Sequence, residues 1–172
     1  MYCNKLLQVS SGTQDDLSSE RGVDYTQLRD YLKYQQWREA NKETSVVMLQ
    51  AVGRKKDDWL RSEELLNFPC TDLHTIDHLW VKYSDGNFGF SVQKEIYLSV
   101  GGKLDGSYNE EALEQFGDRV GWRVDSNWIN FSEVIFDTSA QTGHLPHGGD
   151  FVLYQSFESA RFLFSRIEIC KL

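Results

Sequence analysis

Three side chains that can bind zinc follow one another at intervals of four residues: Cys70, His74 and His78. A helix that contained all three would place them on one face. Zinc accepts thiolate and imidazole ligands, but it needs a fourth ligand, and Pro69 puts Cys70 at or before the start of that helix. We therefore favour a buried structural thiol beside two solvated histidines over a metal site.

A second pair of histidines, His144 and His147, flanks Pro146 in a long segment that is both polar and aromatic. Either imidazole could be an axial ligand to the metal of a macrocycle, or could titrate near neutral pH as a proton-sensitive latch. Loop histidines are more often exposed to solvent without a special role. The sequence alone favours that simpler interpretation.

Motifs for covalent catalysis or phosphate binding are missing from the sequence. It contains no GxSxG nucleophile elbow, and the glycine pairs at 101–102 and 148–149 lack the spacing of a phosphate-binding loop. Acidic pairs such as Glu63-Glu64 lie at expected helix starts, where the helix dipole favours them. We therefore predict that the protein is not an enzyme.

Large aromatic side chains are concentrated in the last third of the chain, outside the clear helical patterns. Loops normally avoid apolar groups that nothing covers, so these rings either fold back as a plug or surround a ligand, and the sequence leaves both open. Arginines could bind the carboxylates of an amphipathic ligand. The aromatic residues are Trp122, Trp128, Phe131, Phe151, Tyr154 and Phe157, and the arginines are Arg54, Arg61, Arg119, Arg123 and Arg161.

Apolar residues at helical spacing predict the helices that must position these groups. They cover approximately residues 24–34, 37–51, 62–66, 71–84, 91–100 and 109–120. Thr71, Ser91 and Asn109 can cap three of them. Residues 121–131 alternate around an Asp-Ser turn, which predicts a small hairpin or irregular ribbon, and a long aromatic loop follows over 137–160. The fold class is therefore all-α, with a final apolar stretch that returns to the core.

The composition is that of one globular domain with a short tail. Of 172 residues, 40% are hydrophobic and 13% aromatic, which suffices for a core. Residues 10–21 are polar and aperiodic, so we expect a flexible arm over 1–21 and a domain over 22–172. A net charge of −8 argues against nucleic acid, and no apolar run is long enough to span a membrane. The odd, scattered cysteines favour a reducing compartment over a disulfide framework.

One long run of the sequence resembles a known family. FPCTDLHTIDHLWVKYSDGNFGFSVQKEIY is similar to the signature of the genomes-uncoupled-four family, the porphyrin-binding regulators of magnesium chelatase in oxygenic phototrophs. VDYTQLRDYLKYQQWREANKET and WLRSEELLNFPC before it, and FGDRVGWRV, GHLP and FSRIE after it, extend the resemblance. It covers residues 22–146 well, whereas HGGDFVLYQSFESAR matches no known pattern of the family.

This resemblance implies a cupped, mostly helical domain whose concave face binds protoporphyrin and magnesium-protoporphyrin, with bilins bound by some members. It implies a monomeric, non-catalytic regulator that stimulates magnesium chelatase through its porphyrin-binding subunit during chlorophyll biosynthesis. The implied location is a cyanobacterial cytoplasm or a plastid stroma, at most peripheral to membranes. The alternative is a bilin-responsive or ligand-independent module that docks onto another protein.

We expect two walls around such a ligand. The apolar wall comprises the ribbon and the loop after it: Trp122, Trp128, Phe131, Leu145, Phe151 and Leu153. The floor has Phe88 and Phe90 near the cavity, with Arg54 or Arg61 toward the propionates. Plain core packing is the competing interpretation for Phe88, Phe90 and Trp122. We also expect residues 143–157 to form a mobile lid, because glycines and Pro146 allow a hinge.

Overall fold

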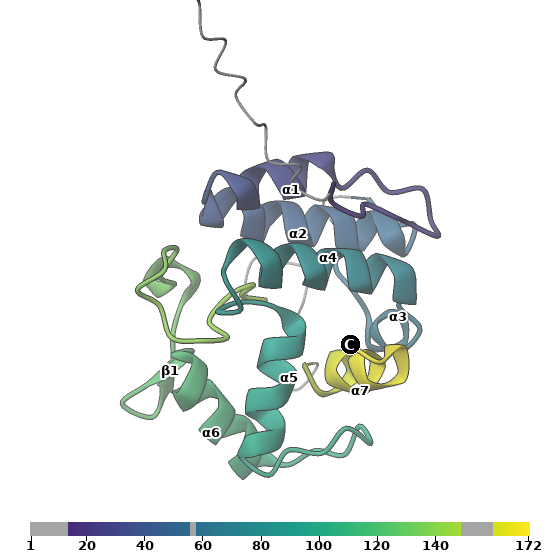
Figure 1. Ribbon diagram of the computed structural model, residues 1–172. Helices are drawn as coiled ribbons and strands as arrows, with labels where there is room; N and C mark the ends of the chain where they lie inside the picture. Colours follow the sequence, from purple (N-terminus) through teal and green to yellow (C-terminus); the bar gives the residue numbers. More distant parts are fainter. Residues whose placement is uncertain (1–13, 56–57, 149–159) are drawn as a thin grey trace, which may run out of the picture.

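The computed structural model describes residues 14–55, 58–148 and 160–172, which form a mostly helical fold (Figure 1). The all-α prediction is confirmed, as is the small hairpin around the Asp-Ser turn. No helix in these ranges is both long and apolar enough to cross a membrane. The elements in chain order are α1 (Thr26–Lys33), α2 (Trp37–Ala51), α3 (Ser62–Leu66), α4 (Cys70–Tyr83), α5 (Phe90–Ser99), α6 (Glu110–Val120), β1 (Arg123–Val124), β2 (Asn127–Trp128), the 3-10 turn η1 (Phe131–Glu133) and α7 (Ala160–Cys170).

The helices are arranged so that the two ends of α2 lie beside different parts of the molecule. α1 packs on α2 and α4, while α5 packs on α6, which in turn carries β1. The hairpin lies at the left of Figure 1, and α3 and α7 lie at the right. Since α2 leads into α3, its C-terminal end faces the α3 side, and its N-terminal end faces the hairpin side.

One aromatic cluster of the core joins α2, α4 and the turn between α4 and α5. Trp37 meets Trp80 and Phe88 with ring centroids 6.1 and 5.4 Å apart. The Trp80 indole Nε1 donates to Thr44 Oγ1 at 2.9 Å, so its polar atom is satisfied inside the core. Burial of rings of this size contributes about 2–3 kcal/mol each. The aromatic-rich turn that the sequence singled out is therefore part of the core.

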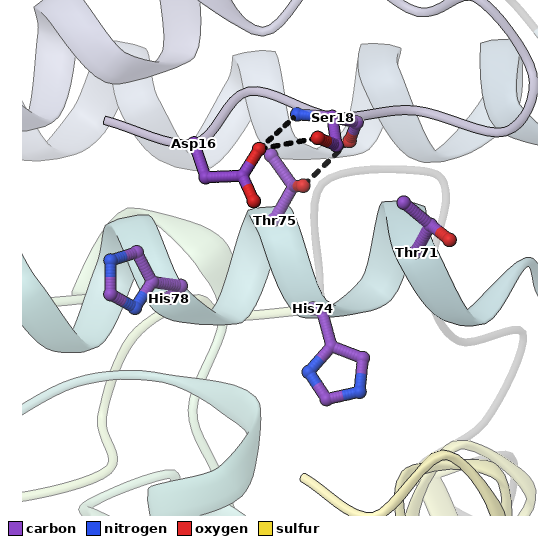
Figure 2. Close-up of a pocket in the computed structure, with 6 residues that line it drawn as sticks. All are labelled: Asp16, Ser18, Thr71, His74, Thr75 and His78. Carbon is purple, nitrogen blue, oxygen red and sulfur yellow. Dashed lines mark hydrogen bonds between the residues drawn. The ribbon is translucent and has the colours of Figure 1, made fainter. Parts of the chain in front are cut away.

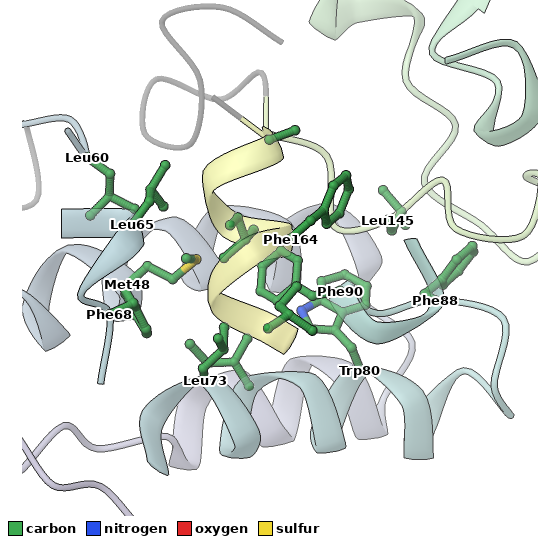
Figure 3. Close-up of a cluster of buried hydrophobic side chains, with 14 of the residues drawn as sticks. Met48, Leu60, Leu65, Phe68, Leu73, Trp80, Phe88, Phe90, Leu145 and Phe164 are labelled. Carbon is green, nitrogen blue, oxygen red and sulfur yellow. The ribbon is translucent and has the colours of Figure 1, made fainter. Parts of the chain in front are cut away.

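α7 lies in the middle of the buried hydrophobic cluster to which Trp80 and Phe88 also belong (Figure 3). Its apolar side chains Leu163, Phe164 and Ile167 have no solvent exposure. Phe164 stacks on Tyr97 of α5 at 5.1 Å and meets Phe116 of α6 at 5.5 Å. α7 also packs against α3 and α4. The apolar C-terminal stretch thus returns to the core, as predicted, and does so as a helix.

A disulfide between Cys70 and Cys170 joins the start of α4 to the end of α7. This corrects the expectation of free thiols, and of a buried thiol at Cys70 in particular. The two residues are 100 positions apart in the sequence, and only the packing of α7 against α4 brings their Cα atoms to 5.3 Å. Lys94 Nζ also donates to the carbonyl of Leu172 at 2.7 Å, which holds the same end of the chain.

The described part of the predicted flexible arm, residues 14–21, lies against α4. The Asp72 carboxylate is fully buried and accepts hydrogen bonds from Ser19 Oγ and from the backbone N–H of Glu20. Thr75 Oγ1 donates to the Ser18 carbonyl at 2.6 Å. A buried carboxylate needs such partners, so residues 18–20 contact α4 through these hydrogen bonds. Residues 1–13 lie outside the described residues.

Residues 143–148, the first part of the predicted lid, are a fixed part of the core. Every one of them is buried, and Gln93 of α5 donates two hydrogen bonds of 2.9 Å to their carbonyls. Asn41 of α2 pairs with both backbone groups of His147, at 2.6 and 3.2 Å. The lid prediction is therefore wrong for these residues, because two helices hold them by side-chain hydrogen bonds. Residues 149–157 lie outside the described residues.

Candidate functional site

The cysteine and two histidines spaced for zinc are used in other ways. Cys70 is bonded to Cys170, so it supplies no thiolate. His74 Nε2 lies 2.8 Å from the Cys170 carbonyl, which can only accept, so this nitrogen carries the proton. Within the described ranges no three His, Cys, Asp or Glu side chains are grouped so that they could hold a metal ion. All three residues lie in α4, as their spacing predicted, but their contacts do not support a zinc site.

A pocket of about 280 Å³ lies between α4 and residues 14–21 (Figure 2). Polar side chains line it, and Thr75 is hydrogen-bonded to Ser18 at its edge. Ligand pockets for organic molecules are mostly apolar and are about 300 Å³ or larger. The pocket is therefore a poor match for a flat apolar ligand. The lining residues are Asp16, Ser18, Thr71, His74, Thr75 and His78.

His144 and His147 are buried, which corrects the expectation that they face solvent. His144 Nδ1 donates to the Val120 carbonyl at 2.7 Å, and its Nε2 accepts the backbone N–H of Ile135 at 3.0 Å. These two partners fix a neutral tautomer protonated at Nδ1. The His147 ring meets the edge of Trp122 at 4.9 Å. Both imidazoles thus help to hold residues 143–148 against α6 and the hairpin.

The surroundings of the two histidines disfavour their charged forms. Burial lowers the pKa of His144 below its ordinary value, despite a hydrogen bond to the Val120 carbonyl that acts in the opposite direction. Burial, with a further effect of nearby His144, lowers the pKa of His147 from 6.5 to about 4. The unfolded chain therefore binds a proton between these pH values that the folded chain does not bind.

Acidification should destabilise the fold through His147. Stability from this group is complete above pH 6.5 and falls as pH decreases toward 4, because protons bind preferentially to the unfolded chain. Between pH 7 and pH 5 the free energy of unfolding should fall by about 2 kcal/mol from this one residue. Urea unfolding at both pH values measures the fall. In His147→Asn, which cannot titrate at this position, the free energy of unfolding should fall by about 2 kcal/mol less between the two pH values. If it falls equally in both proteins, His147 is not the group responsible.

The hairpin and the residues that follow it carry a surface of half-buried apolar side chains, which we call the ribbon surface: Trp128, Ile129, Phe131 and Phe136. Phe131 and Phe136 meet edge to face with ring centroids 5.5 Å apart. Trp128 packs on Gly117 of α6, where a Cβ atom would lie 2.5 Å from the indole ring. Only glycine leaves room there, so α6 and β2 position the indole. Exposed Ile135 and Val124 adjoin these rings in the chain.

The predicted apolar contacts fall into three groups. Trp128 and Phe131 keep solvent-accessible surface on the ribbon surface. Four others have no exposed area and pack in the core, where a ligand could reach them only after rearrangement: Phe88, Phe90, Trp122 and Leu145. Phe151 and Leu153 lie outside the described residues. A direct role in binding stays a prediction for all of them.

The two predicted arginines lie at the opposite end of α2 from the ribbon surface. Arg54 is held by Glu64 at 2.5 Å and by Asp58 at 2.8 Å, and Arg61 lies 3.8 Å from the same Glu64. α2 has 15 residues, which corresponds to a separation of about 20 Å between its ends. The structure therefore does not bring the arginine part of the predicted site together with the ribbon.

A second pocket, of about 470 Å³, opens beside these arginines, between the end of α2 and α3. Two carboxylates and several amides or backbone groups dominate its lining, which suits a polar ligand better than a flat apolar one. The lining residues are Arg21, Gln50, Ala51, Val52, Gly53, Glu63, Glu64, Asn67 and Pro69.

Sequence reasoning missed Phe136 of the ribbon surface and the neighbouring Arg38 of α2. The Arg38 guanidinium lies 4.2 Å from the ring centroid of Phe136 and 6.0 Å from that of Phe131. Phe136 lies five residues beyond the end of the predicted ribbon, so only a longer ribbon would have included it. Arg38 directly follows the buried Trp37 in the helix predicted over 37–51. Nothing in its spacing identifies partners in a distant part of the chain.

Comparison with known proteins gives consistent matches. A model of the family described as GUN4-like matches residues 18–161. A Ycf53-like protein of Synechocystis is 34% identical over 133 residues, which cover 76% of this chain and 53% of that protein. A tetrapyrrole-binding protein of Arabidopsis thaliana chloroplasts is 34% identical over 131 residues, which cover 69% of this chain and 46% of that protein.

The fold matches solved structures as well. The structure of GUN4 from Chlamydomonas reinhardtii aligns with a TM-score of 0.69 at 31% identity and covers 86% of this chain and 92% of that one. The chain spans about half the length of the curated relatives it matches, since the aligned part is 53% of the Synechocystis protein.

Proposed function

Because the chain belongs to the GUN4-like family, as its motifs indicated, we propose that it is a non-catalytic regulator that binds a tetrapyrrole. The family relationship carries the proposal, since it includes a relative named as a tetrapyrrole-binding protein. The ribbon surface supports it with physical chemistry. Half-buried rings that already pack edge to face offer a preformed apolar contact for a macrocycle.

The energetics favour such a ligand. A porphyrin has two broad apolar faces, and covering them contributes about 25 cal/mol per Å² before ordering costs. Even partial cover by the ribbon surface is compatible with micromolar binding. We propose protoporphyrin and magnesium-protoporphyrin as ligands, with a bilin as the linear alternative. Trp128 and Phe131 are the proposed contacts among the described residues, and Phe151 and Leu153 are proposed contacts from the loop that follows.

We further propose that the ligand-loaded protein stimulates magnesium chelatase through its porphyrin-binding subunit, and so acts in chlorophyll biosynthesis. On this proposal it works as a monomer in a cyanobacterial cytoplasm or a plastid stroma, at most peripherally attached to membranes. Chelatase turnover with and without the purified chain tests this part. Unchanged turnover, together with intact porphyrin binding, would favour the alternative of a module that docks onto another partner.

Trp128→Ala should weaken porphyrin binding by about 1–2 kcal/mol, because the indole is a half-buried ring on the proposed contact surface. Titration of protoporphyrin, magnesium-protoporphyrin and biliverdin, followed by the Soret shift and tryptophan quenching, measures it. The matched control is Trp59→Ala, because Trp59 is 43% exposed and lies at the other end of α2, with its ring 5.5 Å from the Arg61 guanidinium.

Each outcome of this titration is informative. Loss of binding in Trp59→Ala but not in Trp128→Ala would move the site to the end of α2 where Arg54 and Arg61 lie. No saturable change with any of the three ligands at micromolar concentration would contradict tetrapyrrole binding itself. A response to biliverdin alone would favour the bilin-responsive alternative.

A further inference from the structure

We propose that Arg38 is the residue that binds the carboxylate edge of the ligand at the ribbon surface. This inference rests on the proposed function, because it assigns a specificity-determining residue to the same site. Cyclic and linear tetrapyrroles alike carry propionate side chains, so the assignment does not depend on which of them is bound. It differs from the sequence-based expectation, which gave this role to Arg54 or Arg61.

The Arg38 guanidinium lies over aromatic rings of the ribbon surface. Arg38 is solvent-exposed, and its Cζ lies 4.2 Å from the ring centroid of Phe136 and 6.0 Å from that of Phe131. A guanidinium over an aromatic face is held in place without its N–H groups being used. Its donors therefore remain available, beside the rings that would cover the apolar face of the ligand. A carboxylate can bind such a planar group with two parallel hydrogen bonds.

No acid competes for Arg38 among the residues that the structure describes. Across the described ranges, no Asp or Glu side chain forms an ion pair with Arg38. Arg54, by contrast, is held by two carboxylates at 2.5 and 2.8 Å, so a propionate would have to displace them. Arg61 shares one of those acids, Glu64. Among these three arginines, Arg38 is the one that forms no ion pair with a carboxylate of the described residues.

The positive charge of Arg38 is not explained by helix stability, and it opposes the net charge of the chain. Arg38 lies in the first turn of α2, where the helix dipole disfavours a positive charge, so helix stability does not explain it. The chain as a whole carries a net charge of −8, which repels a ligand with two carboxylates. A cation next to the apolar contact surface offsets that repulsion locally.

The test compares protoporphyrin IX with its dimethyl ester, which has the same ring but no negative charges. The unchanged protein should bind the free acid about tenfold more tightly than the ester, as expected for one charge-assisted pair. Arg38→Ala should bind both equally, and Arg38→Lys should keep part of the preference, because lysine retains the charge but not the planar fork. Added salt should weaken binding of the free acid to the unchanged protein more than to Arg38→Ala.

Two controls separate the role of Arg38 from a general effect of charge. Lys103→Ala removes an exposed lysine between α5 and α6 and gives the same net charge, and it should keep the full preference for the free acid. Arg54→Ala tests the sequence-based assignment directly. Thermal unfolding of every variant checks the fold, and Arg38→Gln replaces Arg38→Ala if alanine is not tolerated.

The outcomes distinguish this inference from the function on which it rests. If Arg38→Ala keeps the preference, or if the unchanged protein binds acid and ester equally, the inference is wrong while tetrapyrrole binding stands. Loss of the preference in Arg54→Ala alone would return the role to Arg54. If the unchanged protein binds neither form, both the inference and the proposed function fail.

Discussion

Replacing both Cys70 and Cys170 with alanine should lower the free energy of unfolding by roughly 4 kcal/mol. The disulfide closes a loop whose ends are 100 residues apart, and opening it gives the unfolded chain much more conformational freedom. In the chain-entropy account, loops of this length give effects of about 4–5 kcal/mol. Urea unfolding under non-reducing conditions measures the change.

Reduction of the unchanged protein provides an independent test of the same bond. Dithiothreitol should shift its unfolding by a similar amount and should not affect the double variant. Cys3→Ala is the matched control, because it removes the third cysteine and leaves the pair intact. Identical unfolding curves with and without dithiothreitol would show that the bond is not formed or contributes nothing.

Trp122→Ala should also lower the free energy of unfolding strongly, by about 3–5 kcal/mol. The side chain has no solvent exposure, its ring meets Phe116 at 5.4 Å, and its Nε1 donates to the carbonyl of His144 at 2.8 Å. Alanine leaves a large cavity and removes the donor from a buried carbonyl. Chemical denaturation monitored by circular dichroism measures the loss.

The matched control for this prediction is Trp128→Ala in the same hairpin. Trp128 is half-buried, so its loss should cost about 1 kcal/mol of stability while it weakens porphyrin binding more. The interpretation of Trp122 as core would be overturned by the opposite pattern. Unchanged stability with weakened binding in Trp122→Ala would make it a ligand contact, as the sequence suggested.

Local patterns predicted the helices and the hairpin well. Leu73, Ile76 and Trp80 lie at helical spacing, and all three are buried on one side of α4. Asn109 caps α6 by accepting the N–H of Ala112 at 3.2 Å, as its residue type predicted. Short-range periodicity and side-chain caps are properties of neighbouring residues, so the sequence contains them directly.

Features that depend on distant contacts were not predicted. Ser91 was expected to cap α5, but Asp77 of α4 accepts the Ser91 N–H at 2.8 Å, and the helix begins at Phe90. The disulfide and the burial of His147 likewise depend on how separate helices pack. Periodicity indicates which face of a helix is apolar, but it does not indicate which segment covers that face.

The candidate site shows the same limit. The ribbon was correctly located, and Trp128 and Phe131 are on its surface, because aromatic residues outside helices are visible in the sequence. Arg38 was missed because its partners, Phe131 and Phe136, lie in a distant part of the chain. The family resemblance indicated a ligand class, and only the structure separated Arg38 from the two arginines that are occupied by acids.

The central position of α7 has a consequence for synthesis of the protein on the ribosome. Chains emerge from the N-terminal end, and segments pack as their partners become available. α3, α4 and α5 emerge first. In the folded protein, α7 packs against all three of these helices and covers apolar side chains on them. Until residues 160–170 have emerged, Leu73 and Phe90 are partly exposed in the nascent chain. Chaperones can bind such exposed apolar side chains. The hydrophobic core is therefore completed only after α7 has been synthesised and packs against these helices. The disulfide between Cys70 and Cys170 can form only at that stage.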